Sequence, residues 1–203
     1  MKRSGLSAAV FAFVAGLVSS PMVHAQDSAL TASHDLYFSG TVGGGVMKFG
    51  GPKTIALTYY GVDASAEVCR ANVNSWDLCG GANLFRSLGG GTKTTTAGLF
   101  NFTTKTDVTA IGGFVKARKQ MDQFAIAPYA GFRRFLIKTD VSGLGMPTTV
   151  KENGNAVFGG VEFDYNLMDE KVFLSVKAEV GRSFGGPINR TSFLFAPGLK
   201  VKF

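Results

Sequence analysis

Few side chains in this sequence could do acid–base or nucleophilic chemistry. Histidine is the usual general base near neutral pH, and the chain has two, His24 and His34. No predicted strand carries a serine–histidine or aspartate–histidine pair, and no group of residues has metal-ligand spacing. His34 stands alone near the N-terminal edge, where a solvated role is more common than catalysis. We therefore expect no enzyme activity, catalytic residue, metal site or cofactor.

The two cysteines, Cys69 and Cys79, are the other reactive side chains. An even number of cysteines in an exported protein indicates a disulfide. Two thiols without a nearby histidine are too few ligands for a metal site, and the spacing excludes a redox C-x-x-C motif. The bridge closes a short loop, for which the chain-entropy model gives about 2.5–3 kcal/mol of stabilisation.

Export itself is predicted from the N-terminus, which has the three parts of a secretory signal peptide. Lys2 and Arg3 form a basic start, and residues 6–18 are apolar and uncharged. Small residues occupy positions −3 and −1 of a cleavage site after Ala25, so Gln26 would be the first mature residue. The apolar stretch is shorter than the ~20 residues of a membrane-spanning helix. We predict a cleaved signal peptide over residues 1–25 and export through the Sec pathway.

The other end of the chain bears on what the exported protein becomes. No apolar run after residue 25 is long enough for a spanning helix, which leaves a soluble exported protein or a membrane β-barrel. Phe203, Val201 and Leu199 share one face of an alternating terminal strand with Phe195 and Phe193. This pattern resembles the C-terminal signal that the barrel assembly machinery recognises. We expect Phe203, Val201 and Leu199 to form that assembly signal.

Alternation of apolar and polar residues with period two continues through the mature chain and predicts strands with two different faces. Within residues 171–184, for example, Val176, Ala178 and Val180 alternate with Lys177 and Glu179. Eight such segments of roughly 10–15 residues suit tilted membrane strands better than soluble ones. They cover residues 36–46, 53–62, 92–104, 107–119, 124–138, 155–167, 171–184 and 191–203.

The connections between these segments differ in length, as in outer-membrane barrels. If Phe203 lies at the periplasm, residues 120–123 and 168–170 are short periplasmic turns and residues 139–154 form a long external loop. Residues 63–91, which carry both cysteines, then fall on the periplasmic side and fit poorly. This segment is either an unusual periplasmic element, with a short helix over residues 64–78 as one option, or a sign that strands near 82–104 are miscounted.

The signal peptide, alternating strands, paired glycines, unequal loops and terminal Phe203 together resemble the small OmpA/OmpX-type outer-membrane barrels. The resemblance implies an all-β fold, an antiparallel up-and-down transmembrane β-barrel of eight strands built from residues 26–203. It also implies a location in the bacterial outer membrane. Membrane-embedded lipid A deacylases, phospholipases and omptin-type proteases of that compartment need a histidine paired with serine or aspartate, and only His34 is available in the mature chain.

Alternation alone does not say which face of the strands meets water. In a soluble exported barrel of lipocalin type, the apolar face would surround a ligand, whereas in a membrane barrel the ionic face would fill the lumen. Strand length, loop asymmetry and the terminal phenylalanine favour the membrane barrel. Small eight-stranded barrels have just enough interior for side chains to fill, and buried charges must be paired. We therefore expect a lumen plugged by an ionic cluster: Lys116, Arg133, Glu162, Asp164, Lys177, Glu179 and Lys200.

The charge of the chain suggests partners. Loss of Lys2 and Arg3 with the signal peptide lowers the formal charge from +7 to about +5. Export argues against nucleic acid, and membrane lipids with anionic lipopolysaccharide are the expected partners. The expected function is a structural or surface-interaction role, in adhesion or envelope integrity, with external loops contacting a host or cell-surface ligand. A narrow channel for small solutes is the alternative.

Overall fold

The computed structural model describes residues 36–51, 54–73, 76–97, 100–143, 148–184 and 190–203. All of these residues belong to one compact unit, residues 34–203. The predicted signal peptide, its cleavage site between Ala25 and Gln26, and His34 lie outside the described residues. No helix among the described residues could cross a membrane.

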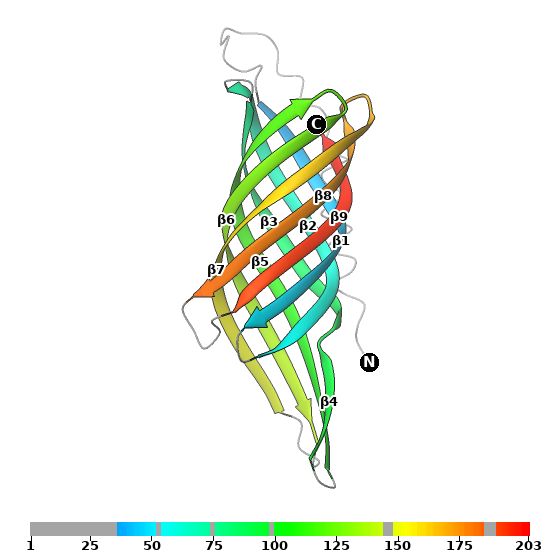
Figure 1. The fold of residues 1–203 in the computed structure, drawn as a ribbon, viewed down its shortest axis with the longest axis vertical. Coiled ribbons are helices and arrows are strands. Elements are labelled where there is room, and N and C mark those ends of the chain that lie inside the picture. Colours follow the sequence, from blue (N-terminus) through cyan, green and yellow to red (C-terminus); the bar gives the residue numbers. More distant parts are fainter. Residues whose placement is uncertain (1–35, 52–53, 74–75, 98–99, 144–147, 185–189) are drawn as a thin grey trace, which may run out of the picture. The chain divides into compact units, whose positions relative to one another are not determined.

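The described residues fold into antiparallel strands that close into a ring (Figure 1). The strands are β1 (Leu36–Gly51), β2 (Thr54–Val73), β3 (Trp76–Gly90), β4 (Thr92–Ala97), β5 (Phe100–Met121), β6 (Phe124–Ser142), β7 (Thr148–Met168), β8 (Val172–Phe184) and β9 (Thr191–Lys202). Gly91, at φ +69°, separates β3 from β4, and both of these strands pair with β5. Since β1 also pairs with β9, the ring has eight strand positions and the predicted up-and-down barrel is confirmed.

Two of the predicted strands and the segment 63–91 require correction. Residues 100–121 form one strand, whereas the sequence pattern predicted two strands over 92–104 and 107–119. The described residues of the segment 63–91 complete β2 and form β3, so they include neither a separate periplasmic element nor a helix, and the strands near 82–104 were miscounted. The alternation is hard to read in this segment because small residues such as Ala64 and Ala66 replace large apolar ones on the outward face.

The strands are staggered around the ring. Pairing partners followed from Lys48 on β1 pass through Phe193, Val180, Gly159, Ala130, Val115, Gly80 and Val68, and return to β1 at Phe38, ten residues before the start. A stagger of this kind tilts the strands of a closed barrel. Each step of this circuit therefore descends toward the end that carries the C-terminus by a little more than one residue.

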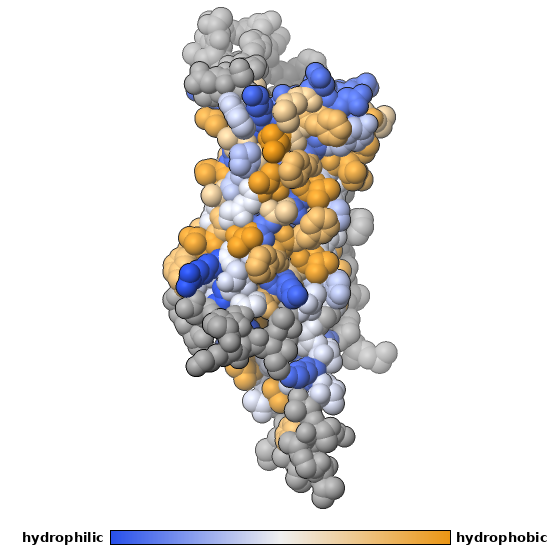
Figure 2. All heavy atoms as spheres, in the orientation of Figure 1, coloured by the Kyte–Doolittle hydropathy of each residue, from blue (hydrophilic) through white to orange (hydrophobic). Residues whose placement is uncertain are grey.

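Apolar side chains predominate on the part of the barrel wall seen in Figure 2. Phe38, Phe163, Phe195 and Leu199 are each more than half exposed, while charged residues such as Glu162 are buried inside. At the C-terminal end, Phe203 is anchored by its backbone N–H, which donates to the carbonyl of Phe38 at 2.8 Å. Apolar residues outside and charges inside are the arrangement of a membrane barrel. The soluble, lipocalin-like alternative is therefore wrong.

Four strands continue beyond the ring at the end opposite the C-terminus, where Figure 1 places β4. There β4 pairs only with β5, and β7 pairs with β8 only from Asn155 onward, although its pairing with β6 extends to Thr148. The extensions of β4, β5, β6 and β7 thus make a sheet that projects from the barrel wall, which we term the projecting sheet. It includes described parts of the predicted loop 139–154, which are strands rather than loop.

Candidate functional site: the closed lumen

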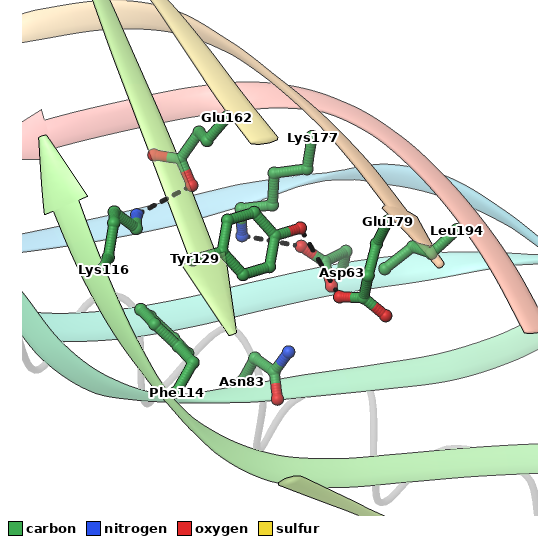
Figure 3. A pocket seen from close by; sticks show the side chains of 9 residues that line it. All are labelled: Asp63, Asn83, Phe114, Lys116, Tyr129, Glu162, Lys177, Glu179 and Leu194. Carbon is green, nitrogen blue, oxygen red and sulfur yellow. Dashed lines mark hydrogen bonds and ion pairs between the residues drawn. The ribbon is translucent and has the colours of Figure 1, made fainter. Parts of the chain in front are cut away.

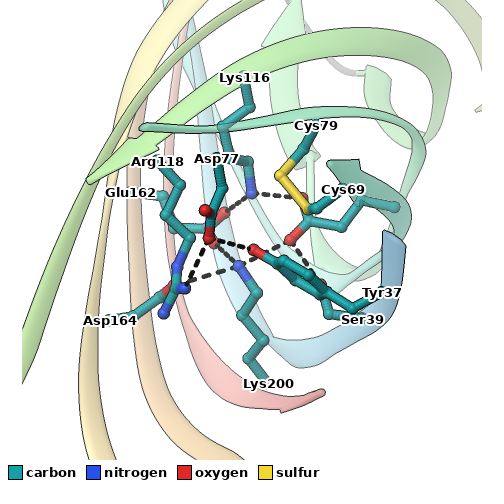
Figure 4. Close-up of a disulfide and its surroundings, with 11 residues drawn as sticks. Tyr37, Ser39, Cys69, Asp77, Cys79, Lys116, Arg118, Glu162, Asp164 and Lys200 are labelled. Atoms are coloured by element: carbon teal, nitrogen blue, oxygen red, sulfur yellow. Dashed lines mark hydrogen bonds and ion pairs between the residues drawn. A yellow bond between two sulfur atoms is a disulfide. The ribbon is translucent and has the colours of Figure 1, made fainter. Parts of the chain in front are cut away.

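Four charged side chains from four strands form a square inside the C-terminal half of the barrel, part of which is drawn in Figure 4. Lys116 on β5 lies 2.6 Å from Glu67 on β2 and 2.8 Å from Glu162 on β7. Lys200 on β9 lies 2.7 Å from each of the same two carboxylates. Each lysine therefore contacts both glutamates, which is the pairing that buried charges require.

The square continues toward the C-terminal end of the lumen. The ammonium of Lys200 also lies 3.1 Å from Asp164, and the Nε atom of Arg118 lies 3.2 Å from the same carboxylate. Arg118 then reaches Asp77 at 3.6 Å, and the hydroxyl of Tyr37 donates to Asp77 at 2.8 Å. Ion pairs and hydrogen bonds therefore connect the square with the mouth of the barrel (Figure 4).

The predicted disulfide is present beside this network. Cys69 and Cys79 are directly opposite partners on β2 and β3, with their Cα atoms 4.0 Å apart. Both are buried and pack with Tyr37 on the lumen side. Glu67 and these two cysteines are the group of potential metal ligands found among the described residues. The bridge uses both sulfur atoms, so this group has no thiolate to offer a metal.

The middle of the lumen holds a second set of ion pairs, of which Figure 3 draws Lys177 with Asp63 and the carboxylate of Glu179. Arg133 on β6 donates two hydrogen bonds to Glu179 on β8, one of them from Nη2 to Oε2 at 2.9 Å. The hydroxyl of Tyr129 donates to the same carboxylate at 3.4 Å, and Lys177 on β8 lies 2.9 Å from Asp63 on β2. The cavity between these groups has a volume of about 10 Å³, close to the room that one water molecule needs.

Beyond Arg133, toward the projecting sheet, apolar side chains fill the lumen. Phe49 packs edge-on against Tyr59 and Phe135, with ring centroids 5.7 and 5.2 Å away. The whole cluster comprises Met47, Phe49, Tyr59, Phe85, Val108, Ala110, Phe135, Ile137, Ala156, Leu194 and Ala196. Within the described part of the chain, an ion would have to pass both a layer of fixed charges and this apolar layer, so the lumen is closed.

The buried charges of the lumen balance. Among the described residues, five cations (Lys116, Arg118, Arg133, Lys177, Lys200) and five carboxylates (Asp63, Glu67, Glu162, Asp164, Glu179) are buried. All seven residues of the expected ionic cluster lie in this set. The sequence predicted pairing between neighbouring strands, but these ion pairs join strands that are not adjacent: β5 meets β7 past β6, and β8 meets β2 past β9 and β1.

Three members of the set were not anticipated from the sequence. Asp63 and Glu67 fall in the segment 63–91, to which no strand was assigned. Arg118 lies two residues after Lys116 on the same strand, so the alternation within 107–119 could have identified it. The apolar layer was also missed, because the expectation treated the inward face as ionic along its whole length.

The projecting sheet presents a polar outer face. Lys138 is directly opposite Lys151 across β6 and β7, and both are exposed. The hydroxyl of Thr149 donates to Asp140 at 2.7 Å, and this hydrogen bond together with Lys138 lowers the pKa of the Asp140 carboxyl. The face therefore offers hydroxyls and charges of both signs to water or to a ligand.

No protein-family model and no curated protein sequence matches this chain. Solved structures with a similar fold do exist. Ail, the attachment invasion locus protein of Yersinia pestis, is 10% identical, with a TM-score of 0.52 over 83% of this chain and 99% of Ail. Ail in complex with the heparin analogue sucrose octasulfate gives a TM-score of 0.51 at 12% identity, with the same coverage.

A major outer membrane protein from Thermus thermophilus gives a TM-score of 0.56 at 17% identity, over 84% of this chain and all of that one. These similarities confirm the predicted resemblance in fold to small outer-membrane barrels. Together with the apolar outer surface, they agree with the predicted location in a bacterial outer membrane.

Proposed function

We propose that this protein is a non-conducting outer-membrane barrel with a structural and surface-interaction role, and that the projecting sheet contacts a host or cell-surface ligand. The closed lumen is the observation that carries this proposal. Charged pairs fill its C-terminal and middle parts, and the apolar cluster fills the rest. A barrel filled in this way acts through its outer surfaces rather than through its interior.

Planar-bilayer recording tests the first half of the proposal. The purified, folded protein should give no steady conductance steps, because an ion would have to displace paired charges and then cross the apolar layer. Enlarging the lumen by changing Phe49, Tyr59 and Phe135 to alanine provides a positive control for insertion. Steady open steps from the unmodified protein would instead support the small-solute channel.

Shortening the β6–β7 hairpin tests the second half. Since Lys138 pairs with Lys151, residues 139–150 can be replaced by Asn-Gly without changing the register of the remaining strands. We expect bacteria that carry this variant to keep a folded barrel and to lose attachment to host cells or to neighbouring bacteria. Unchanged attachment would rule out this hairpin as the contact surface.

A further inference from the structure

Four exposed cations encircle the outer wall of the barrel: Lys48 on β1, Arg86 on β3, Arg134 on β6 and Arg182 on β8. All four side chains belong to outward faces of their strands. Their strands are distributed around the ring rather than adjacent to one another. We term this set the basic ring.

The stagger of the strands brings the four cations to one level. The pairing circuit that starts at Lys48 reaches β8 at Val180 after two steps, β6 at Ala130 after four and β3 at Gly80 after six. Arg182, Arg134 and Arg86 lie two, four and six residues above those crossing points, on strands that all run away from the C-terminal end. Because each step descends by slightly more than one residue, these offsets cancel the descent. The four cations therefore lie within about two residues of a common level.

The basic ring lies near the outer edge of the apolar surface, and above three of its cations stands one further exposed apolar side chain each: Leu88, Leu136 and Phe184. Two residues below each cation, on the same outward face, stand Val46, Leu84, Phe132 and Val180. Phe132 and Val180 are about half exposed, as expected for side chains that face lipid. The cations thus stand in the outermost band of the apolar surface, from which long basic side chains can extend to the headgroup layer of a bilayer.

The charge around the barrel wall is asymmetric. Among the described residues, none of the four cations has an ion pair with a carboxylate. The nearest outward carboxylate above the ring is Asp107, on the projecting sheet. At the opposite edge of the apolar surface, by contrast, the exposed cations Arg70, Lys119 and Lys171 are matched by three exposed turn carboxylates: Asp122, Asp169 and Glu170. One boundary is therefore unbalanced and positive, and the other is neutral.

From this placement we propose that the basic ring binds the phosphate groups of lipid A, the phosphorylated glycolipid anchor of lipopolysaccharide, in the outer leaflet. Three of the four residues are arginines, whose guanidinium groups bind phosphate oxygens in pairs. The ring lies at the end of the barrel that faces outward if the C-terminus is periplasmic. The inference rests on the proposed outer-membrane role, but it does not depend on whether the lumen conducts.

The test compares unfolding equilibria in phosphatidylcholine vesicles with and without lipid A. A cation near an anionic membrane surface contributes roughly a fivefold change in an equilibrium constant. Lipid A should therefore lower the unfolding constant of the native protein, and changing Arg86, Arg134 and Arg182 to glutamine should remove roughly a hundredfold of that effect. The control variant changes Lys105, Lys138 and Lys151 to glutamine. It loses the same charge at the same end, but farther from the apolar edge.

The proposal predicts that the control keeps the lipid A effect, and that inorganic phosphate added to vesicles without lipid A has none. If the triple ring variant does not fold, the single change Arg134→Gln should still reduce the lipid A effect roughly fivefold. Equal losses in ring and control variants would show diffuse charge attraction and overturn the proposal. An undiminished effect in the ring variant, or an equal effect of inorganic phosphate, would also overturn it. Bilayer conductance is a separate measurement, so failure of the non-conducting role is distinguishable from each of these results.

Discussion

Replacing Arg133 with methionine tests whether the ion pairs of the lumen support the fold. The side chain lies between Glu179, to which it donates two hydrogen bonds, and the ring of Phe158, whose centroid is 4.3 Å from the guanidinium carbon. Methionine has a similar length and no charge. The substitution therefore leaves the carboxylate of Glu179 inside the barrel without its cation.

The expected cost follows from burial. Arg133 is 1% exposed and Glu179 is 5% exposed. Removing one partner of a buried ion pair costs about 3–5 kcal/mol, because the other charge stays uncompensated. Tyr129 still donates to the carboxylate, so we expect a loss near the lower value, about 3 kcal/mol, or roughly a 150-fold change in the unfolding constant.

A second substitution distinguishes the loss of the ion pair from any other effect of changing residue 133. If the cost arises from an uncompensated carboxylate, changing Glu179 to glutamine in the Arg133→Met background should restore at least half of the lost stability. The matched control is Arg134→Met, one residue along the same strand and exposed on the outer face. In phosphatidylcholine vesicles, which have no net charge, it should change the free energy of unfolding by less than about 0.5 kcal/mol.

Denaturant unfolding in phosphatidylcholine vesicles measures all three variants. Fluorescence of the single tryptophan, Trp76, and the gel mobility of unheated samples report the folded fraction. The reasoning fails if Arg133→Met unfolds like the native protein, or if the double variant is no more stable than the single one.

Two further changes test other parts of the barrel in the same assay. Replacing Cys69 and Cys79 together with serine should lower the free energy of unfolding by about 2.5–3 kcal/mol, and a difference below about 1 kcal/mol would contradict the loop-closure estimate. Gly43→Val places a side chain against the backbone of Pro197, where β1 meets β9, and should prevent the ring from closing, so that the compact band of unheated samples disappears. Gly44→Val, whose added carbon meets nothing within 4 Å, should fold normally, and equal behaviour of the two variants would refute this steric argument.

The sequence was most informative where large apolar residues alternate strictly with polar ones. In β8, Val176, Ala178 and Val180 alternate with Lys177 and Glu179, and the strand was found within one residue of its bounds. In β2 and β3, glycine and alanine weaken the outward pattern, so these strands were partly missed. These outward glycine and alanine residues are still non-polar, but they are too small to be recognised as an apolar face.

The lumen shows a second limit of sequence reasoning. Parity along a strand indicates that Lys177 points inward, but its partner Asp63 is 114 residues away. Which inward charges meet depends on the stagger of the whole ring, since the stagger sets the height of every residue. That quantity is fixed only when β1 pairs with β9, and no local pattern encodes it.

The position of the disulfide orders the steps by which this protein matures. Its sulfur atoms lie inside a closed wall, where a protein oxidant the size of a domain cannot approach them. The two cysteines are only ten residues apart, on strands that pair as one hairpin, so they can meet in a chain that is not yet a barrel. Oxidation therefore belongs to the interval between export and membrane insertion. Once the barrel has closed, its wall shields the disulfide from thiols outside, so the bridge formed in that interval persists.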